Sequence, residues 1–227
     1  SIMSLSRQYN LKVIEDCAEA HGAMYNGKKV GSFGDVGCFS FYGNKVITTG
    51  EGGMCVTNSI KLNDRLRLLR DHGMSKTKRY YHEVVGYNYR MTNLQAAIGL
   101  AQLERIDKIH KNRFLYEQLY RESILKTRFQ FQQILENREK ITWLVCLLVD
   151  ENTERDKVIK VLEQNGIDAR PFFYPLSDMD IYKKYSHSSN PVAKKISSHG
   201  INLPTYENLK SIEEIRIIIE EIIKDKL

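Results

Sequence analysis

The chain has 227 residues, of which 42% are hydrophobic and 27% charged, and its formal net charge is +6. This is the composition of an ordinary soluble globular protein that can bury a core of its own. No apolar run reaches the roughly 18 residues that span a bilayer. A membrane-spanning protein is therefore not favoured. The basic residues are mixed with acids and form no stripe interleaved with aromatics, so a nucleic-acid-binding protein is not favoured either.

The four cysteines are far apart in the sequence and form no Cys-x-x-Cys pair. They are Cys17, Cys38, Cys55 and Cys146. This spacing is typical of reduced cysteines in a cytoplasmic protein and does not suggest a metal site. No signal peptide is visible at the N-terminus. We therefore expect a cytoplasmic protein without a structural metal.

Residues 1–122 alternate strand-like and helix-like segments. The expected strands are residues 11–16, 36–42 and 53–58, and the expected helices are residues 1–10, 59–71 and 93–122. Ser59 or Asn58 is a plausible N-cap of the second helix and Thr92 of the third. A polar, aromatic-rich loop is expected at residues 73–89. Short apolar runs that alternate with helices indicate an α/β layer structure.

The pattern changes after residue 121. Strands are expected at residues 127–133 and 141–150, and helices at residues 153–165 and 212–223. We place a domain boundary near residue 120. Residues 1–120 are then part of a large α/β domain that ends in a long bridging helix, and residues 121–227 are a small α+β domain.

Asp16 ends the first apolar run. In open α/β sheets ligands bind outside the carboxyl ends of the strands, where such an acid projects. A carboxylate at that place can keep a ring nitrogen protonated, as the pyridine of pyridoxal phosphate (PLP) requires. A helix N-cap or a salt-bridged acid remains the alternative.

Lys45 follows a strand and precedes the Gly-rich run that ends at Gly53. A lysine in such a loop is partly desolvated, which favours imine chemistry, and glycines let the backbone approach a phosphate or a ring. An ordinary surface lysine in a turn is the alternative. The Gly31-x-x-Gly34 motif lacks the strand-then-helix context of a dinucleotide fingerprint.

Several motifs in the same order resemble the DegT/DnrJ/EryC1/StrS family of sugar aminotransferases. They are residues 13–23, 31–35, 39–53, 86–92, 170–175 and 201–204. The resemblance covers the whole chain. It implies an α/β PLP-dependent transferase fold of the aspartate aminotransferase type, with part of a large domain of mainly parallel sheet and a small α+β C-terminal domain.

The resemblance implies a role for individual residues. Lys45 would form the Schiff base with PLP and carry protons between cofactor and substrate. Asp16 would pair with the pyridinium nitrogen, and Ser40 would donate to the cofactor phosphate. Asn88 would reach the phosphate in the neighbouring subunit's site, which implies a homodimer with shared active sites.

Other positions are weaker candidates. Glu19 is a cofactor-binding candidate where many relatives have Gln, and a Glu can donate to the cofactor's phenolate oxygen only when it is protonated. Arg90 and His82 are candidates for substrate contact, although a structural salt bridge is an alternative for Arg90. Phe173 and Tyr174 could line a nucleotide-sugar site, although aromatic clusters are more often core.

The resemblance also implies a missing part. Family members have about a further third of their sequence before the position of Ser1, with the first strands of the sheet, a phosphate-binding loop and the aromatic that stacks on the cofactor. If these 227 residues are the whole protein, cofactor binding should be weak and turnover negligible.

The implied reaction is PLP-dependent transamination of a nucleotide-linked 4-keto-6-deoxy sugar, with L-glutamate as amino donor, in polysaccharide biosynthesis. Residues 41–45, 86–92 and 170–175 look most like the branch that converts GDP-4-keto-6-deoxymannose to GDP-perosamine. A UDP- or dTDP-linked 4-keto-6-deoxyglucose is the alternative substrate. A non-catalytic PLP-fold protein and a dinucleotide-dependent dehydrogenase are alternatives of other classes.

Overall fold

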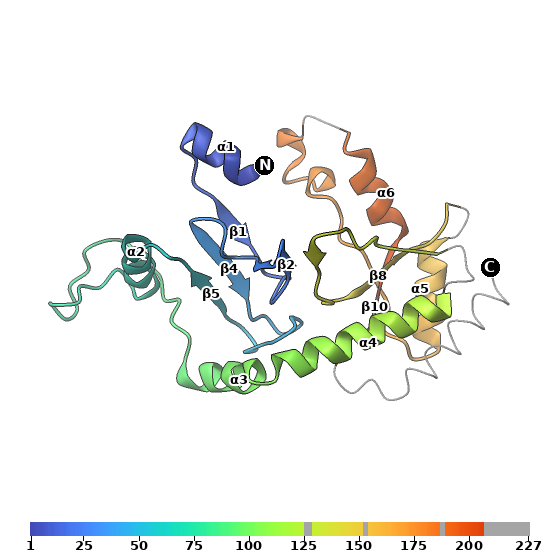
Figure 1. Cartoon of the computed structure of the whole chain (residues 1–227), viewed down its shortest axis with the longest axis horizontal. Coiled ribbons are helices and arrows are strands. Elements are labelled where there is room, and N and C mark those ends of the chain that lie inside the picture. The colour runs from blue at the N-terminus through green and yellow to red at the C-terminus, as the bar shows by residue number, and fades with distance from the viewer. Residues whose placement is uncertain (125–128, 152–153, 187–188, 207–227) are drawn as a thin grey trace. The chain divides into compact units, whose positions relative to one another are not determined.

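The computed structural model describes residues 1–124, 129–151, 154–186 and 189–206 (Figure 1). The chain forms two compact units. One contains Ser1–His110 and Leu135–Trp143, and the other contains Lys111–Ile134 and Leu144–Leu227. The domain boundary expected near residue 120 falls within a helix, and as a boundary between domains it stays a prediction.

The first unit is built on a three-stranded sheet of order β1-β4-β5 (Figure 1). Its strands are β1 (Ile14–Asp16), β4 (Val36–Ser40) and β5 (Gly53–Val56). β1 and β4 run parallel, with Asp16 opposite Cys38, and β4 and β5 run antiparallel. All three strands lie inside the segments expected from the sequence. The carboxyl ends of the two parallel strands therefore lie at one edge of the sheet.

Glu15, in the middle of β1, organises the loop that leads into β4. Its carboxylate accepts hydrogen bonds from the backbone N–H groups of Gly31 (2.7 Å), Phe33 (2.6 Å) and Gly34 (2.6 Å). Gly31 has a positive φ of 85°, a conformation that favours glycine. The Gly31-x-x-Gly34 motif thus binds a carboxylate of its own chain.

We expect Glu15→Ala to lower the free energy of unfolding by roughly 2–3 kcal/mol, because three backbone donors lose a charged acceptor. Glu15→Gln keeps one carbonyl oxygen and should lose less. Chemical denaturation of both variants checks this. An alanine variant as stable as the parent chain would contradict it.

A small antiparallel sheet of order β3-β2-β7 also belongs to this unit and was not expected from the sequence. Its strands are β2 (Met24–Tyr25), β3 (Lys28–Lys29) and β7 (Arg138–Glu139). Each is only two residues long, too short for an alternating pattern to be visible. β7 brings residues 135–143 back to the first unit.

The helices of the first unit lie inside the segments expected from the sequence. They are α1 (Ile2–Tyr9), α2 (Ile60–Arg70) and α3 (Asn93–Leu103). Ser59 caps α2, since its hydroxyl accepts from the N–H of Leu62 at 3.3 Å. Thr92 and Gln95 form a capping box at the start of α3.

The single helix expected over residues 93–122 is instead two helices, which corrects the sequence prediction. α3 ends at Leu103, and α4 runs over Ile106–Ile124. The N–H of Arg105 bonds to the carbonyl of Gln102, three residues back, at 3.0 Å. This tighter turn interrupts the α-helical bonding, and the apolar periodicity on either side does not reveal it.

The second unit contains an antiparallel sheet of order β6-β8-β10-β9. Its elements are β6 (Gln130–Phe131), β8 (Val145–Leu148), α5 (Arg155–Gln164), β9 (Arg170–Pro171), the 3-10 turns η1 (Leu176–Asp178) and η2 (Lys183–Tyr185), α6 (Pro191–His199) and β10 (Gly200–Leu203). The expected helix at residues 212–223 lies outside the described residues.

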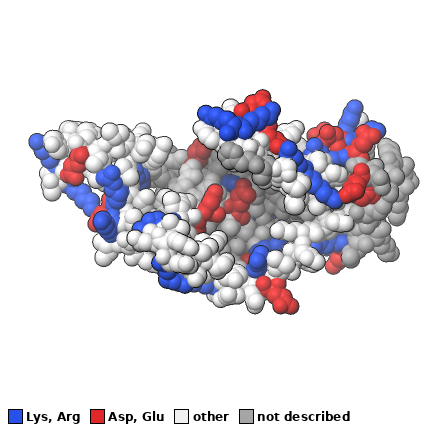
Figure 2. Space-filling view, turned by 90° about the horizontal axis from the view of Figure 1, so that it is seen from above, with Lys and Arg blue, Asp and Glu red and all other residues white. Residues whose placement is uncertain are grey.

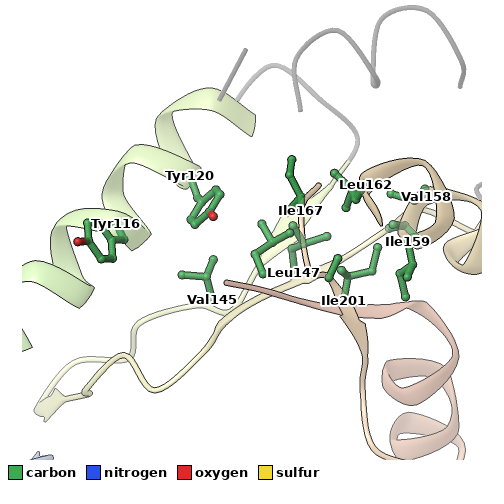
Figure 3. Packing of buried hydrophobic residues seen from close by; sticks show 12 residues of the cluster. Tyr116, Tyr120, Val145, Leu147, Val158, Ile159, Leu162, Ile167 and Ile201 are labelled. Atoms are coloured by element: carbon green, nitrogen blue, oxygen red, sulfur yellow. The ribbon is translucent and has the colours of Figure 1, made fainter. Parts of the chain in front are cut away.

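The largest apolar cluster lies within the second unit (Figure 3). Tyr116 and Tyr120 of α4 contribute to it, with Val145 of β8 and Ile201 of β10. Tyr120 is 1% exposed, and its hydroxyl donates to the carbonyl of Pro204 at 3.2 Å. The polar end of this core tyrosine is thereby satisfied.

The surface carries mixed charge. On the face seen in Figure 2, Lys and Arg side chains lie among Asp and Glu rather than in one continuous stripe. None of the helices in the described part of the chain has both the length and the apolar character needed to cross a membrane.

Candidate active site

Two of the candidate residues end neighbouring parallel strands. Asp16 is the last residue of β1 and Ser40 the last of β4. Asp16 is exposed, and its Oδ1 accepts from the N–H of Ala18 at 3.1 Å. Ser40 Oγ accepts from the N–H of Tyr42 at 3.2 Å, which leaves its own hydroxyl hydrogen to donate. Both polar groups stand where an open α/β sheet binds ligands.

Lys45 lies in a tight turn directly after β4. Its backbone N–H donates to the carbonyl of Tyr42 at 3.0 Å. The next two residues, Val46 and Ile47, are each 4% exposed and pack with Ile109 of α4 in a small apolar cluster. The lysine is therefore followed at once by buried residues that anchor its backbone.

The loop after Lys45 is also held by a side chain of α3. The N–H of Thr48 donates to Gln102 Oε1 at 3.1 Å, and Gln102 Nε2 donates back to the carbonyl of Thr48 at 2.6 Å. The Thr48 hydroxyl donates to the carbonyl of Phe41 at 2.9 Å. These bonds close the loop on itself and on the helix, so the position of Lys45 is defined by rigid neighbours.

The Lys45 amine contacts an acid and an aromatic ring. Its Nζ lies 2.9 Å from Glu19 Oε1 and 4.2 Å from the centre of the Trp143 ring. The lysine side chain is only 11% exposed, whereas that of Glu19 is 49% exposed. An amine held this way is largely withdrawn from water but has an acid within proton-transfer distance. The ordinary surface lysine considered as an alternative does not fit this environment.

Trp143 was not predicted as a site residue. The sequence shows it only as the start of an apolar run, and it approaches Lys45 because β7 returns residues 135–143 to the first unit. Its Nε1 donates to the carbonyl of Asn44 at 2.7 Å. Trp143 therefore fixes the backbone before Lys45 and also covers the amine. A contact between residues nearly a hundred positions apart leaves no local sequence signal.

The loop between α2 and α3 carries three further candidates, all exposed. Asn88 forms an isolated β-bridge with Asp71. Arg90 forms a long ion pair with Asp71 at 3.5 Å, which is the structural alternative named for it. His82 Nδ1 lies 2.8 Å from the carbonyl of His72. None of these contacts reaches Lys45, so substrate or cofactor contact by these three residues stays a prediction.

Phe173 and Tyr174 follow β9 in the second unit. They are 72% and 71% exposed. The core alternative for these two aromatics is therefore not what the structure shows, and their contact with a nucleotide sugar stays a prediction.

His21, in the loop that follows β1, is buried in the first unit. Its ring packs 5.5 Å from that of Phe39 and 5.9 Å from that of Phe41. Burial lowers the pKa of His21, and the nearby His110 and Lys45 act in the same direction. The folded protein therefore favours the neutral imidazole.

We expect acid to destabilise the fold partly through His21. Because its pKa is lower in the folded than in the unfolded chain, the unfolded chain takes up the proton first, and stability is lost as the pH falls from about 6.5 through the folded value. In His21→Leu the loss of unfolding free energy from about pH 8 to about pH 5 should be smaller. His82→Leu, at an exposed position, is the control. Equal pH dependence in the parent chain and His21→Leu would contradict this.

Comparison with known proteins shows the family to which the chain belongs. The profile of the DegT/DnrJ/EryC1/StrS aminotransferase family matches residues 1–223. The chain belongs to this family. The members of the family use PLP as cofactor.

Among curated relatives, the GDP-perosamine synthase of Vibrio cholerae is 44% identical over 92% of this chain and 58% of its own length. That of Caulobacter vibrioides is 43% identical over 96% of this chain and 60% of its own length. That of Escherichia coli O157:H7 is 41% identical over 99% of this chain and 62% of its own length. The chain thus spans about three fifths of the length of these relatives.

Solved structures show the same fold. PseC of Helicobacter pylori, an aminotransferase involved in pseudoaminic acid biosynthesis, has a TM-score of 0.89 at 26% identity and matches 98% of this chain and 62% of its own. The PLP form of the sugar aminotransferase Spr1654 from Streptococcus pneumoniae has a TM-score of 0.86 at 26% identity, over 97% of this chain and 59% of its own.

The residues present fit PLP. Lys45 supplies a shielded primary amine, Asp16 a carboxylate and Ser40 a hydroxyl with a free hydrogen. These are the groups that an aldehyde, a pyridinium nitrogen and a phosphate require. The donor set is complete for an aldehyde and a ring nitrogen and partial for a phosphate.

We expect Trp143→Ala to lower the free energy of unfolding by roughly 2–4 kcal/mol, because packing and the bond to Asn44 are both lost. Trp143→Phe keeps a ring over Lys45 and should cost about 1 kcal/mol.

Trp143 is also the only tryptophan in the chain, so PLP bound at Lys45 should quench its fluorescence. If PLP binds but the fluorescence of Trp143 does not change, the expected proximity of Trp143 to a cofactor at Lys45 is contradicted.

Proposed function

We propose that this protein is a PLP-dependent aminotransferase that moves the amino group of L-glutamate to the keto carbon of a nucleotide-linked 4-keto-6-deoxy sugar. The observation that carries the proposal is the position of Lys45, which is shielded by Trp143, paired with Glu19 and held by anchored backbone beside the ends of β1 and β4. Membership of the aminotransferase family supports the reaction class.

For the substrate we propose GDP-4-keto-6-deoxymannose, which becomes GDP-perosamine. The support is the identity of 41–44% to three GDP-perosamine synthases. UDP- or dTDP-linked 4-keto-6-deoxyglucose is the second candidate. A dTDP-3-amino-3,6-dideoxy-alpha-D-galactopyranose transaminase of Aneurinibacillus thermoaerophilus is 34% identical to this chain, which keeps other nucleotides in consideration.

Individual residues of the chain would have the following roles in the reaction. PLP, when bound, supplies the electron sink that stabilises negative charge on the reacting carbon. Lys45 holds the cofactor covalently and afterwards moves a proton at its Nζ. Glu19, 2.9 Å away, accepts or returns that proton at Oε1. Asp16 holds a proton on the ring nitrogen by its negative charge, and Ser40 donates to the phosphate.

Trp143 and the buried residues after Lys45 exclude water from one side of the amine. Water therefore competes little for the proton at the amine of Lys45, while the half-exposed Glu19 can exchange protons with solvent. The anchored loop also keeps the amine in one place through both halves of the reaction, which lowers the entropic cost of each proton transfer.

The proposal includes a homodimer with shared active sites and a cytoplasmic location. Asn88 is exposed on the loop between α2 and α3, which is compatible with its reaching a cofactor phosphate bound by a second subunit. Arg90, His82, Phe173 and Tyr174 are proposed to contact the nucleotide sugar. Sedimentation of the protein and of Asn88→Ala, each with and without PLP, tests the shared site.

A non-catalytic PLP-fold protein is the second candidate function. Against it stands the environment of Lys45, which is shielded by Trp143 and paired with Glu19. A regulator has no need for a shielded amine with a proton acceptor at hydrogen-bonding distance.

The deciding experiment offers PLP, L-glutamate and GDP-, UDP- or dTDP-linked 4-keto-6-deoxy sugars to the protein. We expect one amino sugar and one 2-oxoglutarate for each glutamate consumed, with the GDP sugar preferred. The same assay is run on a form extended with the sequence encoded upstream of Ser1. No amino sugar from any donor and sugar in either form, despite bound PLP, would favour the non-catalytic reading.

A further inference from the structure

Two cysteines lie side by side on neighbouring strands of the three-stranded sheet of the first unit. Cys38 of β4 lies directly opposite Cys55 of β5, and their sulfur atoms are 3.9 Å apart. Both are free thiols. They are seventeen residues apart in sequence, so only the antiparallel pairing of β4 and β5 reveals that they form a pair.

The backbone geometry at this pair suits a covalent link. The N–H of Phe41 donates to the carbonyl of Gly52 at 2.9 Å, which marks these two as a hydrogen-bonded pair of the antiparallel ladder. Such pairs alternate with non-hydrogen-bonded ones, so Cys38 and Cys55, three positions along, form a non-hydrogen-bonded pair with Cα atoms about 4.5 Å apart. This lies at the short end of the range of about 4.4–6.8 Å found in disulfides.

The two thiols differ in access. Cys55 is exposed, whereas Cys38 is half-buried in the middle strand. Burial raises the pKa of Cys38, and Cys55 and Asp16 raise it further. A reagent from solution therefore reaches Cys55 first, and Cys38 is placed to react second.

We propose that Cys38 and Cys55 are a redox-active dithiol that closes to a cross-strand disulfide by exchange with a low-molecular-weight disulfide. The Cys55 thiolate attacks the reagent, forms a mixed disulfide and releases one thiol. The Cys38 thiolate then displaces the second thiol from Cys55. Overall one reagent disulfide is reduced to two thiols, and the protein dithiol is oxidised to one disulfide.

The position of the pair gives the link a consequence. Asp16, Cys38 and Cys55 form one row across β1, β4 and β5. Closing the disulfide brings the sulfur atoms from 3.9 Å to about 2.05 Å and links β4 covalently to β5, next to Asp16. The inference concerns the thiols alone and does not depend on the proposed function.

The remaining cysteines provide internal controls. Cys17 is buried, and its pKa is raised to about 11, chiefly by burial. Cys146 lies in the other unit, where its thiol donates to Asn202 Oδ1 at 3.2 Å. Neither should react at a comparable rate.

The test incubates the 227-residue chain with oxidised glutathione, blocks free thiols by alkylation and measures the intact mass. Two of the four thiols should no longer be free. The measured mass should therefore be that of the reduced chain minus two hydrogens, with two alkyl groups added instead of four. Trypsin cuts after Lys29, Lys45 and Lys61, so a non-reducing digest should contain residues 30–45 joined to residues 46–61. This mapping needs no variant and is unaffected by folding defects of mutants.

Two serine variants separate the steps. Cys38→Ser should stop at glutathione bound to Cys55, since the displacing thiol is absent. Cys146→Ser should behave as the parent chain. The proposal is overturned if the parent chain keeps four free thiols, if it ends with glutathione still on Cys55, or if the mapped link joins Cys17 to Cys38.

Discussion

Replacing Lys45 with alanine is expected to reduce amino transfer by at least about 10³-fold, since the covalent anchor of the cofactor and the proton carrier are lost together. The visible absorbance of bound PLP should disappear as well. The measurement is a turnover assay with L-glutamate and the preferred nucleotide sugar, run beside an absorbance scan.

Lys45→Arg is the matched control. Arginine keeps a positive charge for Glu19 and for the face of Trp143, so it should preserve most of the stability that alanine loses. It does not form the covalent link, so its activity and absorbance should be lost as in the alanine variant. An arginine variant with the activity of the parent protein would show that Lys45 acts only through its charge.

Asp16→Asn has the second largest expected effect. The amide has nearly the shape of the carboxylate but no charge with which to keep the ring nitrogen protonated. We expect turnover to fall by roughly 10- to 100-fold, equivalent to the about 1.5–3 kcal/mol of a hydrogen bond to a charged group. PLP affinity, measured by absorbance titration, should fall in the same variant.

Asp35→Asn distinguishes this effect from a general loss of fold. Asp35 accepts from the N–H of Val13 at 2.9 Å and pairs with Lys12 at 3.2 Å, so its role is structural. These two contacts lower its pKa. The variant should lose stability but keep the absorbance of bound PLP. If Asp16→Asn binds PLP with the same affinity as the parent protein, Asp16 does not contact the cofactor.

Much of the first unit could be predicted because its signals are local. Short apolar runs predicted β1, β4 and β5, and Thr92 and Ser59 cap helices as their side chains suggest. Lys45 was placed correctly in a loop after a strand. Its role, however, came from the resemblance to a family, because the residues alone did not overturn the usual interpretation of an ordinary surface lysine in a turn.

What the sequence did not reveal depends on contacts between distant residues. Trp143 reaches Lys45 only through the return of residues 135–143 to the first unit. Glu15 looks like an ordinary acid in a strand until the loop wraps its carboxylate. The break between α3 and α4 is a change in backbone hydrogen bonding, and the spacing of apolar side chains does not reveal it.

The most direct test of the account locates the cofactor on the chain. The protein is incubated with PLP, reduced with borohydride so that a covalently held cofactor becomes permanent, and digested with trypsin. A modified Lys45 is not cut, so we predict one labelled peptide spanning residues 30–61, absent in Lys45→Arg. Label spread over other lysines, with residues 30–45 and 46–61 recovered separately and unmodified, would contradict the assignment of Lys45.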